Sequence, residues 1–401
     1  MPQLASHLGR LSSEGALEVF ARARELERAG RSIIHLELGE PEFHPAPPVV
    51  EAAREALAAG RDRYGPSEGI PPLREAVVEY LAKTRNLHYR AENVLVAPGC
   101  KMALLMCLLS VIEAGSEVLY PDPGFPMYAS VTRGVGAVPV PFRLLEANRF
   151  QPDVNEIASQ ISPRTRVLLL NSPGNPTGTV YECSVLEALA DLARRHDLWV
   201  VSDEIYARII YGSAYESIAS LPGMAERTLL VDGFSKSFGM TGWRLGYAVA
   251  PPSVISALTL LVINSYSCVP DFLQRGAIEA LHDTQAAVAA TVAEFARRRA
   301  SFVSALNRIH GFRCRPPDGA FYAWINIDGT GMDSAAVCRI LLEEAGVAGI
   351  PGEAFGAAGK GFIRFSFAGA AAQLDEAIRR IAGAAPAWQP ARAAGARSSE
   401  R

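Results

Sequence analysis

Short runs of consecutive apolar residues recur along the first two thirds of the chain, and most are separated by segments long enough for a helix. The runs lie at 94–97, 118–120, 167–170, 198–201, 228–231 and 246–250. Continuous apolarity is typical of strands that are covered on both faces. The pattern therefore predicts an α/β fold with a mostly parallel central sheet and helices between the strands, for example over 184–196.

The pattern changes after about residue 285. A long segment rich in Ala and Arg is followed by a Pro-Pro-Asp-Gly break at 316–319, an alternating strand over 321–327 and two further helix candidates, which predicts a smaller α+β domain. The predicted parts are an N-terminal arm that joins the small domain (1–45), a large ligand-binding domain (46–284), a small domain (285–385) and a disordered tail (386–401).

Composition narrows the functional classes. The 401 residues carry 39 Lys and Arg against 42 Asp and Glu, and a formal charge of −3 gives no general attraction to nucleic acid or to an anionic membrane. The longest apolar stretch, 102–112, is too short to span a bilayer, and the N-terminus lacks a secretory pattern, so we expect a cytoplasmic protein. The six cysteines are scattered, and neither a metal site nor a nicotinamide-binding fingerprint is predicted.

Glycine, proline and polar side chains follow five of the predicted strands. In an open parallel sheet, ligands bind beyond the carboxyl ends of the strands, so these segments are expected to share one site. They are Pro-Gly-Cys-Lys (98–101), Pro-Asp-Pro-Gly-Phe (121–125), Asn-Ser-Pro-Gly-Asn-Pro-Thr-Gly (171–178), Ser-Asp-Glu-Ile-Tyr (202–206) and Asp-Gly-Phe-Ser-Lys (232–236).

These segments, in this order, resemble the class I and II aminotransferases, the aspartate-aminotransferase-like branch of the fold-type I pyridoxal-phosphate enzymes. The resemblance extends from Leu-Glu-Leu-Gly-Glu-Pro at 36–41 to Phe-Ile-Arg-Phe-Ser at 362–366. It implies pyridoxal 5'-phosphate as the cofactor. It also implies that the enzyme moves an amino group between an L-amino acid and a 2-oxo acid by a ping-pong mechanism.

Lys236, Asp203 and Tyr206 are the catalytic residues that the resemblance implies. Lys236 would carry the cofactor as a Schiff base and, once released, would move a proton at the substrate α-carbon. Asp203 follows a buried strand, where a carboxylate needs a partner, and the protonated ring nitrogen of the cofactor would be that partner. An Asp at a strand-to-helix junction also suits a helix cap, which is the alternative for this residue.

Two further contacts with the cofactor ring follow from the resemblance. Asn175 and Tyr206 would hydrogen-bond the phenolic oxygen of the ring and so favour its ionised form. Phe125 would stack on the ring face, although core packing alone also explains an aromatic side chain there.

The phosphate needs backbone amides and a cation. A helix that opens after residue 99 supplies the amides, and an arginine eight residues after Lys236 supplies the charge. The predicted ligands are Gly99, Cys100, Lys101, Ser235 and Arg244. Many relatives place a serine where this chain has Gly233, which leaves the contact of Ser235 open, and the side chain of Lys101 is equally suited to phosphate, substrate or solvent.

The substrate and a second subunit complete the expectations. Arg364 would hold the α-carboxylate of the substrate with its guanidinium, assisted by Asn175 and by the backbone N–H of Gly39. Tyr64 matches a tyrosine that family members donate to the phosphate of a neighbouring subunit, which predicts a homodimer with shared active sites.

Two alternative functions remain open from the sequence. The same scaffold supports lyase, decarboxylase, racemase and cyclase chemistry, because the bond that breaks depends on which substituent lies perpendicular to the ring. A ligand sensor built on the same fold is the second alternative, but the chain has neither the length nor a basic patch for an added DNA-binding domain.

Overall fold

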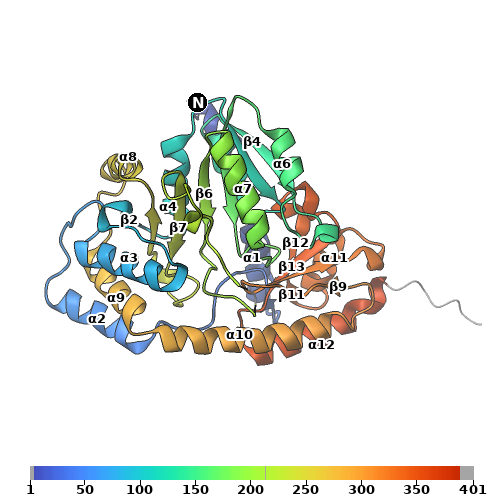
Figure 1. The fold of residues 1–401 in the computed structure, drawn as a ribbon. Coiled ribbons are helices and arrows are strands. Elements are labelled where there is room, and N and C mark those ends of the chain that lie inside the picture. Colours follow the sequence, from blue (N-terminus) through green and yellow to red (C-terminus); the bar gives the residue numbers. More distant parts are fainter. Residues whose placement is uncertain (1–3, 213, 389–401) are drawn as a thin grey trace, which may run out of the picture.

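A seven-stranded sheet forms the centre of the computed structural model, which describes residues 4–212 and 214–388 (Figure 1). The strand order is β2-β8-β7-β6-β5-β3-β4, and all strands are parallel except β8, which runs antiparallel to β2 and β7. The strands are β2 (Val94–Ala97), β3 (Glu117–Asp122), β4 (Val138–Arg143), β5 (Thr165–Asn171), β6 (Trp199–Asp203), β7 (Thr228–Gly233) and β8 (Gly246–Val249). The predicted α/β fold with a mostly parallel sheet is confirmed.

Helices cover both faces of this sheet, which explains the continuous apolar runs. One face packs against α4 (Cys100–Val111), α5 (Met127–Gly134) and α8 (Pro252–Ile263). The other packs against α3 (Pro71–Arg85), α6 (Val154–Gln160), α7 (Cys183–Arg195) and α9 (Asp271–His282), while α2 (Pro47–Ala58) lies against α9. None of the helices in the described part of the chain is long and apolar enough to cross a membrane.

Strand β4 is absent from the prediction because its sequence, Val-Pro-Val-Pro-Phe-Arg, contains two prolines. A proline cannot donate a backbone hydrogen bond, so it argues against a central strand. Strand β4 lies at the edge of the sheet and, within the described residues, pairs only with β3, where Pro139 is opposite Val118 and Pro141 is opposite Tyr120. On the outer side of β4 no described strand needs a backbone N–H from it, so both prolines are tolerated there.

A smaller antiparallel sheet, of order β12-β13-β10-β9, lies beside the large one (Figure 1). Its strands are β9 (Arg313–Cys314), β10 (Tyr322–Asn326), β12 (Ile350–Pro351) and β13 (Phe362–Ser366), with helices α10 (Gln285–Leu306), α11 (Ser334–Glu343) and α12 (Ala371–Ala384) around them. Near the N-terminus, α1 (Gly15–Arg28) precedes β1 (Ile34–His35), which pairs with β11 (Val347–Ala348). The N-terminal segment is thus joined to the C-terminal part of the chain.

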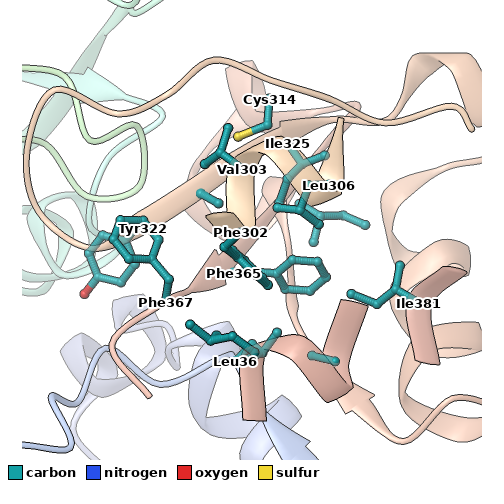
Figure 2. Close-up of a cluster of buried hydrophobic side chains, with 14 of the residues drawn as sticks. Leu36, Phe302, Val303, Leu306, Cys314, Tyr322, Ile325, Phe365, Phe367 and Ile381 are labelled. Atoms are coloured by element: carbon teal, nitrogen blue, oxygen red, sulfur yellow. The ribbon is translucent and has the colours of Figure 1, made fainter. Parts of the chain in front are cut away.

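Figure 2 shows the apolar core of this smaller part, in which Phe302 and Phe365 pack together with residues from β10 and α12. All five residues of β10 are buried, so the strand is covered on both faces and the alternation expected over 321–327 does not correspond to a solvent-exposed side. Tyr322 lies at the border of this core, and its hydroxyl points away from the other labelled side chains. This orientation directs a polar group out of an otherwise apolar cluster.

The first residues of the predicted disordered tail are structured. Trp388 is buried, stacks on Phe312 with ring centroids 5.7 Å apart, and donates its indole N–H to the carbonyl of His310. Burial of this indole anchors residues 386–388, which corrects the start of the tail. The rest of the predicted tail, 389–401, lies outside the described residues.

Candidate active site

A cavity of about 300 Å³ opens between the carboxyl ends of the large sheet and strands β10 and β13 of the small one. All the predicted site residues except Gly99 and Tyr64 line it: Gly39, Cys100, Lys101, Phe125, Asn175, Asp203, Tyr206, Ser235, Lys236, Arg244 and Arg364. The parallel strands bring the predicted segments together because their carboxyl ends meet at one edge of the sheet.

Lys236 lies in the loop after β7. Its ε-amine donates a 2.5 Å hydrogen bond to the carbonyl of Gly39. Burial, followed by the positive charge of Arg364, lowers the pKa of this amine to about 8. A substantial fraction of the lysine is therefore neutral near neutral pH, which a nucleophile or a proton carrier requires.

Asp203 ends β6 and is only 6% exposed. It accepts hydrogen bonds from the hydroxyl of Tyr128 at 2.8 Å and from the backbone N–H of Ile205 at 3.4 Å, and the thiol of Cys100 lies 3.8 Å away. Among the described residues, no cation pairs with this carboxylate. Burial raises its pKa to about 6, so ionised Asp203 favours a positively charged partner from outside the chain.

Tyr206 and Tyr322 form a pair of buried phenols whose oxygens are 2.7 Å apart. Burial, followed by the neighbouring phenol, raises the pKa of Tyr206 well above its ordinary value, so both phenols are neutral donors. Gly39 passes directly beside this pair. A side-chain carbon at Gly39 would lie 2.0 Å from the hydroxyl oxygen of Tyr322, so only glycine fits this position.

Arg364, on β13, is 4% exposed and points into the cavity. It donates hydrogen bonds to the side-chain oxygen of Asn175 at 2.8 Å and to the carbonyl of Glu37, and its guanidinium carbon lies 4.4 Å from the ring centroid of Tyr322. Its Nε is buried without a hydrogen-bond partner among the described residues. A guanidinium so oriented, and facing no carboxylate directly, is suited to a bidentate anion.

Gly99, Ser235 and Arg244 lie together where α4 begins. Gly99 precedes α4 with φ of +84°, and a side-chain carbon there would lie 2.5 Å from a guanidinium nitrogen of Arg244. Ser235 is buried at the cavity wall. A side-chain carbon on Gly233 would lie 2.9 Å from Cα of Gly246, so the backbone leaves little room for a serine at position 233. The backbone N–H groups of α4, Ser235 and Arg244 can together bind a phosphate.

Phe125 and Lys101 line the cavity, whereas Tyr64 does not. Tyr64 is 92% exposed and does not line the cavity of its own chain. The Nζ of Lys101 pairs with the carboxylate of Glu14 and lies 5.4 Å from the ring centroid of Phe125. The side chain of Lys101 is thus engaged away from Gly99, so any contact with a phosphate would come from its backbone.

Several residues of the cavity are missing from the sequence prediction. Tyr128, Tyr322, Glu37 and Glu14 all line it, yet none belongs to a segment that directly follows a predicted strand. Tyr128 follows the predicted Phe125 by three residues; Phe125 precedes α5 and Tyr128 lies in its first turn, and their ring centroids are 5.7 Å apart. The other three come from elements that only the tertiary fold brings to the site.

The comparisons with known proteins agree with this geometry. The family described as aminotransferase class I and II matches residues 31–381. An aspartate aminotransferase from Pyrococcus horikoshii is 40% identical over 91% of this chain and 92% of its own length, and an aromatic-amino-acid aminotransferase from Thermococcus litoralis is 38% identical over 89% and 92%. The structure of Thermus thermophilus aspartate aminotransferase with maleate superimposes with a TM-score of 0.91 at 37% identity, covering 96% of this chain and all of that one.

Proposed function

Since this chain belongs to the class I and II aminotransferases, we propose that Lys236 holds the pyridoxal phosphate cofactor and that Arg364 orients the substrate. The chain is a pyridoxal-phosphate-dependent aminotransferase of fold type I, and its substrates are amino acids and 2-oxo acids. The resemblance drawn from the sequence motifs is thereby confirmed. The roles of individual residues are the part that we propose.

One observation carries the proposal: a single cavity holds a lysine with a lowered pKa, together with a buried carboxylate and a buried guanidinium that form no ion pair with any described residue. The first two features fit a cofactor with an aldehyde and a basic ring nitrogen, and the third fits a substrate with a carboxylate. When bound, pyridoxal phosphate supplies an aldehyde that reacts with amines and a ring that withdraws electrons from the carbon bearing the amino group.

Lys236 acts first as the residue that holds the cofactor covalently. Its pKa of about 8 allows the ε-amine both to accept and to return a proton under physiological conditions. Once released from the cofactor, the ε-amine would accept the proton that leaves the substrate α-carbon. The carbonyl of Gly39, which accepts a hydrogen bond from this amine, gives it a defined resting position.

Asp203 keeps a proton on the ring nitrogen, because an ionised carboxylate in a buried setting stabilises a cation in contact with it. The hydroxyl of Tyr128 fixes one carboxylate oxygen. Tyr206 and the amide NH₂ of Asn175 would donate to the phenolic oxygen, and Phe125 would lie against the ring. The side-chain oxygen of Asn175 is already taken by Arg364, which leaves the NH₂ group free to face the ring.

The phosphate is bound by Gly99, Cys100 and Lys101 through their backbone N–H groups at the start of α4, with Ser235 and Arg244 as further ligands. Arg364 binds the α-carboxylate of the substrate in a bidentate manner, and the backbone N–H of Gly39 closes over the same group. A fixed carboxylate would hold the substrate α-carbon in one orientation beside Lys236. The proton then moves between two groups that are already in position, which lowers the entropic cost of the transfer.

A cytoplasmic homodimer is the proposed form of the enzyme. Tyr64 is 92% exposed and would reach the phosphate of the second subunit, so each site is incomplete without the other chain. Leu260 and Ile263 on α8 are 62% and 55% exposed, which suits an apolar interface. Gly65 donates a hydrogen bond to the sulfur of Cys268, which ties the Tyr64 loop to the segment that follows α8.

The domain boundaries also remain part of the proposal. The large sheet and its helices fall within 46–284 and the small sheet within 285–385, while β1 pairs with β11 of the C-terminal part. This pairing supports an N-terminal arm, 1–45, that belongs in part to the small domain.

The decisive experiment compares Lys236→Ala with the exposed control Lys83→Ala. Purified Lys83→Ala should absorb visible light through its bound cofactor; single amino acids should change that absorbance and a 2-oxo acid should restore it. Lys236→Ala should lose both the covalent attachment and turnover. Near-normal turnover by Lys236→Ala would reject the assignment, and release of carbon dioxide or pyruvate with unchanged absorbance would favour a decarboxylase or lyase.

Family membership leaves the substrate side chain open, because the relatives named above include both an aspartate and an aromatic-amino-acid aminotransferase.

A further inference from the structure

Six of the residues that line the cavity have side chains that the proposed function does not assign to the phosphate, the ring nitrogen or the α-carboxylate, although the backbone of Lys101 and the ring of Phe125 also serve the cofactor. We call this set the side-chain subsite, and it consists of Glu14, Ala16, Leu17, Lys101, Leu104 and Phe125. Four of the six are apolar, and the two charged residues, Glu14 and Lys101, form an ion pair with each other. The subsite therefore presents an apolar surface and one self-contained pair of charges.

Four cations from the described residues line the cavity, and three of them already have a proposed role. Within the described part of the chain, the cations that line the cavity are Lys101, Lys236, Arg244 and Arg364. The proposed function assigns Lys236 to the cofactor aldehyde, Arg244 to the phosphate and Arg364 to the α-carboxylate. Lys101 is the cation that remains for a second carboxylate of the substrate, and Glu14 already occupies it.

Local contacts hold Glu14 at this position. The backbone N–H of Ser12 donates to the hydroxyl of Ser130 on α5 at 3.0 Å, which fastens the segment before α1 to the large sheet. On the other side, Gly15 approaches Ala354 so closely that a side-chain carbon at Gly15 would lie 2.7 Å from Cβ of Ala354. Glu14 is the residue before α1, yet its side chain makes no capping hydrogen bond and reaches Lys101 instead.

Lys101 is held from its own side. Its ammonium lies 5.4 Å from the ring centroid of Phe125, within the range of a cation–π contact. Glu14 makes no ion pair with Arg364, but its charge acts on it from a distance: burial lowers the pKa of this guanidinium, and the carboxylate of Glu14 is among the charges that oppose the shift. To reach Lys101, a second carboxylate of a substrate would have to displace Glu14. It would then lie next to the carboxylate of Glu14, and the repulsion between the two negative charges disfavours this arrangement.

We propose that Glu14 neutralises Lys101 and thereby makes the enzyme select amino acids with an uncharged, mainly apolar side chain over dicarboxylic amino acids. This inference rests on the proposed function, because it takes the cavity as the amino-acid site. An apolar side chain gains from contact with Ala16, Leu17, Leu104 and Phe125 and leaves the ion pair intact.

The test measures binding of two unreactive acids to the holoenzyme, namely 4-methylpentanoate, which carries one carboxylate, and succinate, which carries two. Wild-type enzyme should bind 4-methylpentanoate more tightly. Glu14→Gln keeps the shape of the side chain and frees Lys101, so it should shift the ratio of the two dissociation constants toward succinate by about tenfold or more, a change of about 1.4 kcal/mol. Single-turnover rates with leucine and aspartate should shift in the same direction.

Two control variants make the result specific. Glu25→Gln removes one charge from the exposed face of α1, outside the cavity, and should leave the ratio unchanged. Glu14→Gln combined with Lys101→Met should abolish the shift, because the freed ammonium is then missing. Tighter binding of succinate by wild-type enzyme, an unchanged ratio in Glu14→Gln, or a shift that persists in the double variant would each overturn the inference.

The absorbance of the cofactor distinguishes failure of the proposed function from failure of the role of Glu14. If no amino acid changed the absorbance of the cofactor in any of these proteins, the proposed roles of Lys236 and Arg364 would be wrong, whatever the ratio of the two acids. If amino acids changed the absorbance but the ratio did not respond to Glu14→Gln, only the role of Glu14 would be rejected.

Discussion

Two neighbouring sites at the carboxyl end of the large sheet bury carboxylates in opposite ways. Asp203 contacts the hydroxyl of Tyr128, the thiol of Cys100 and a backbone N–H, and within the described residues it has no cation. Glu204, the next residue, and Asp232 on β7 share the buried guanidinium of Arg85, at 2.9 Å in the case of Glu204. All three carboxylates are at most 6% exposed, so burial does not separate the two sites.

The difference lies in what each carboxylate is paired with. A buried charge without a partner is costly, so a protein that keeps one has a use for it, whereas a paired charge can serve the fold alone. In the Arg85 cluster both carboxylates have a cation from the chain itself, and the cluster does not line the cavity. Asp203 would gain a cationic partner only from a positively charged ligand. Removal of a charge should therefore cost activity at Asp203 and stability at Arg85.

Asp203→Asn should produce the largest effect. The variant keeps the shape of the side chain and the hydrogen bond with Tyr128 but loses the charge that, in our proposal, retains a proton on the ring nitrogen. We expect kcat to fall by about a hundredfold to a thousandfold, comparable with the loss of one preorganised electrostatic contact. Asp197→Asn, whose side chain is 96% exposed just before β6, is the matched control. Unchanged kinetics in Asp203→Asn would reduce Asp203 to a structural residue.

Arg85→Met should destabilise the protein by about 3–5 kcal/mol, because it leaves Glu204 and Asp232 buried without their cation. Urea unfolding of the cofactor-free protein measures this effect, with the exposed Arg90→Met as control. The folded enzyme should keep its kcat within about threefold, since Arg85 does not reach the cavity. A large loss of kcat with unchanged stability would reverse the comparison.

The pH dependence of stability should sharpen the contrast. Burial raises the pKa of Asp203 to about 6 in the chain without cofactor, against an unfolded value near 3.8. The stability linked to neutral Asp203 is thus present below pH 3.8 and is lost as the pH rises through 6. Cofactor-free Asp203→Asn should therefore gain on the wild type by up to about 3 kcal/mol between pH 4 and pH 7, as measured by urea unfolding. If the difference in unfolding free energy between the two proteins did not change with pH, a positive charge near Asp203 would have to compensate its ionisation.

Tyr128→Phe should have the smallest effect. It removes one hydrogen bond to Asp203, which is worth about 1.5 kcal/mol when the acceptor is charged, so kcat should fall by about tenfold. The lost donor should also raise the pKa of Asp203 further, which moves the acidic limb of the kcat profile to higher pH. An unshifted profile would show that Tyr128 only fills space.

The fold was largely predictable because a two-sided parallel sheet leaves a continuous apolar run for each strand. The same topology aligns strand ends, so the segments that hold Lys236, Asp203 and Asn175 were expected to meet, and they do. Strand β4 escaped prediction because its prolines are acceptable only at an edge, and edge position is a property of the assembled sheet.

The sequence by itself determined the family, the cofactor and the residues that follow each strand, because these depend on local motifs in a fixed order. The tertiary structure decided which charges are paired. Glu14 meets Lys101 across 87 positions and Arg85 meets Asp232 across 147, and no local pattern encodes either contact. Pairing depends on distances between elements that approach only when the chain folds, and it separates a carboxylate that supports the fold from one that awaits a ligand.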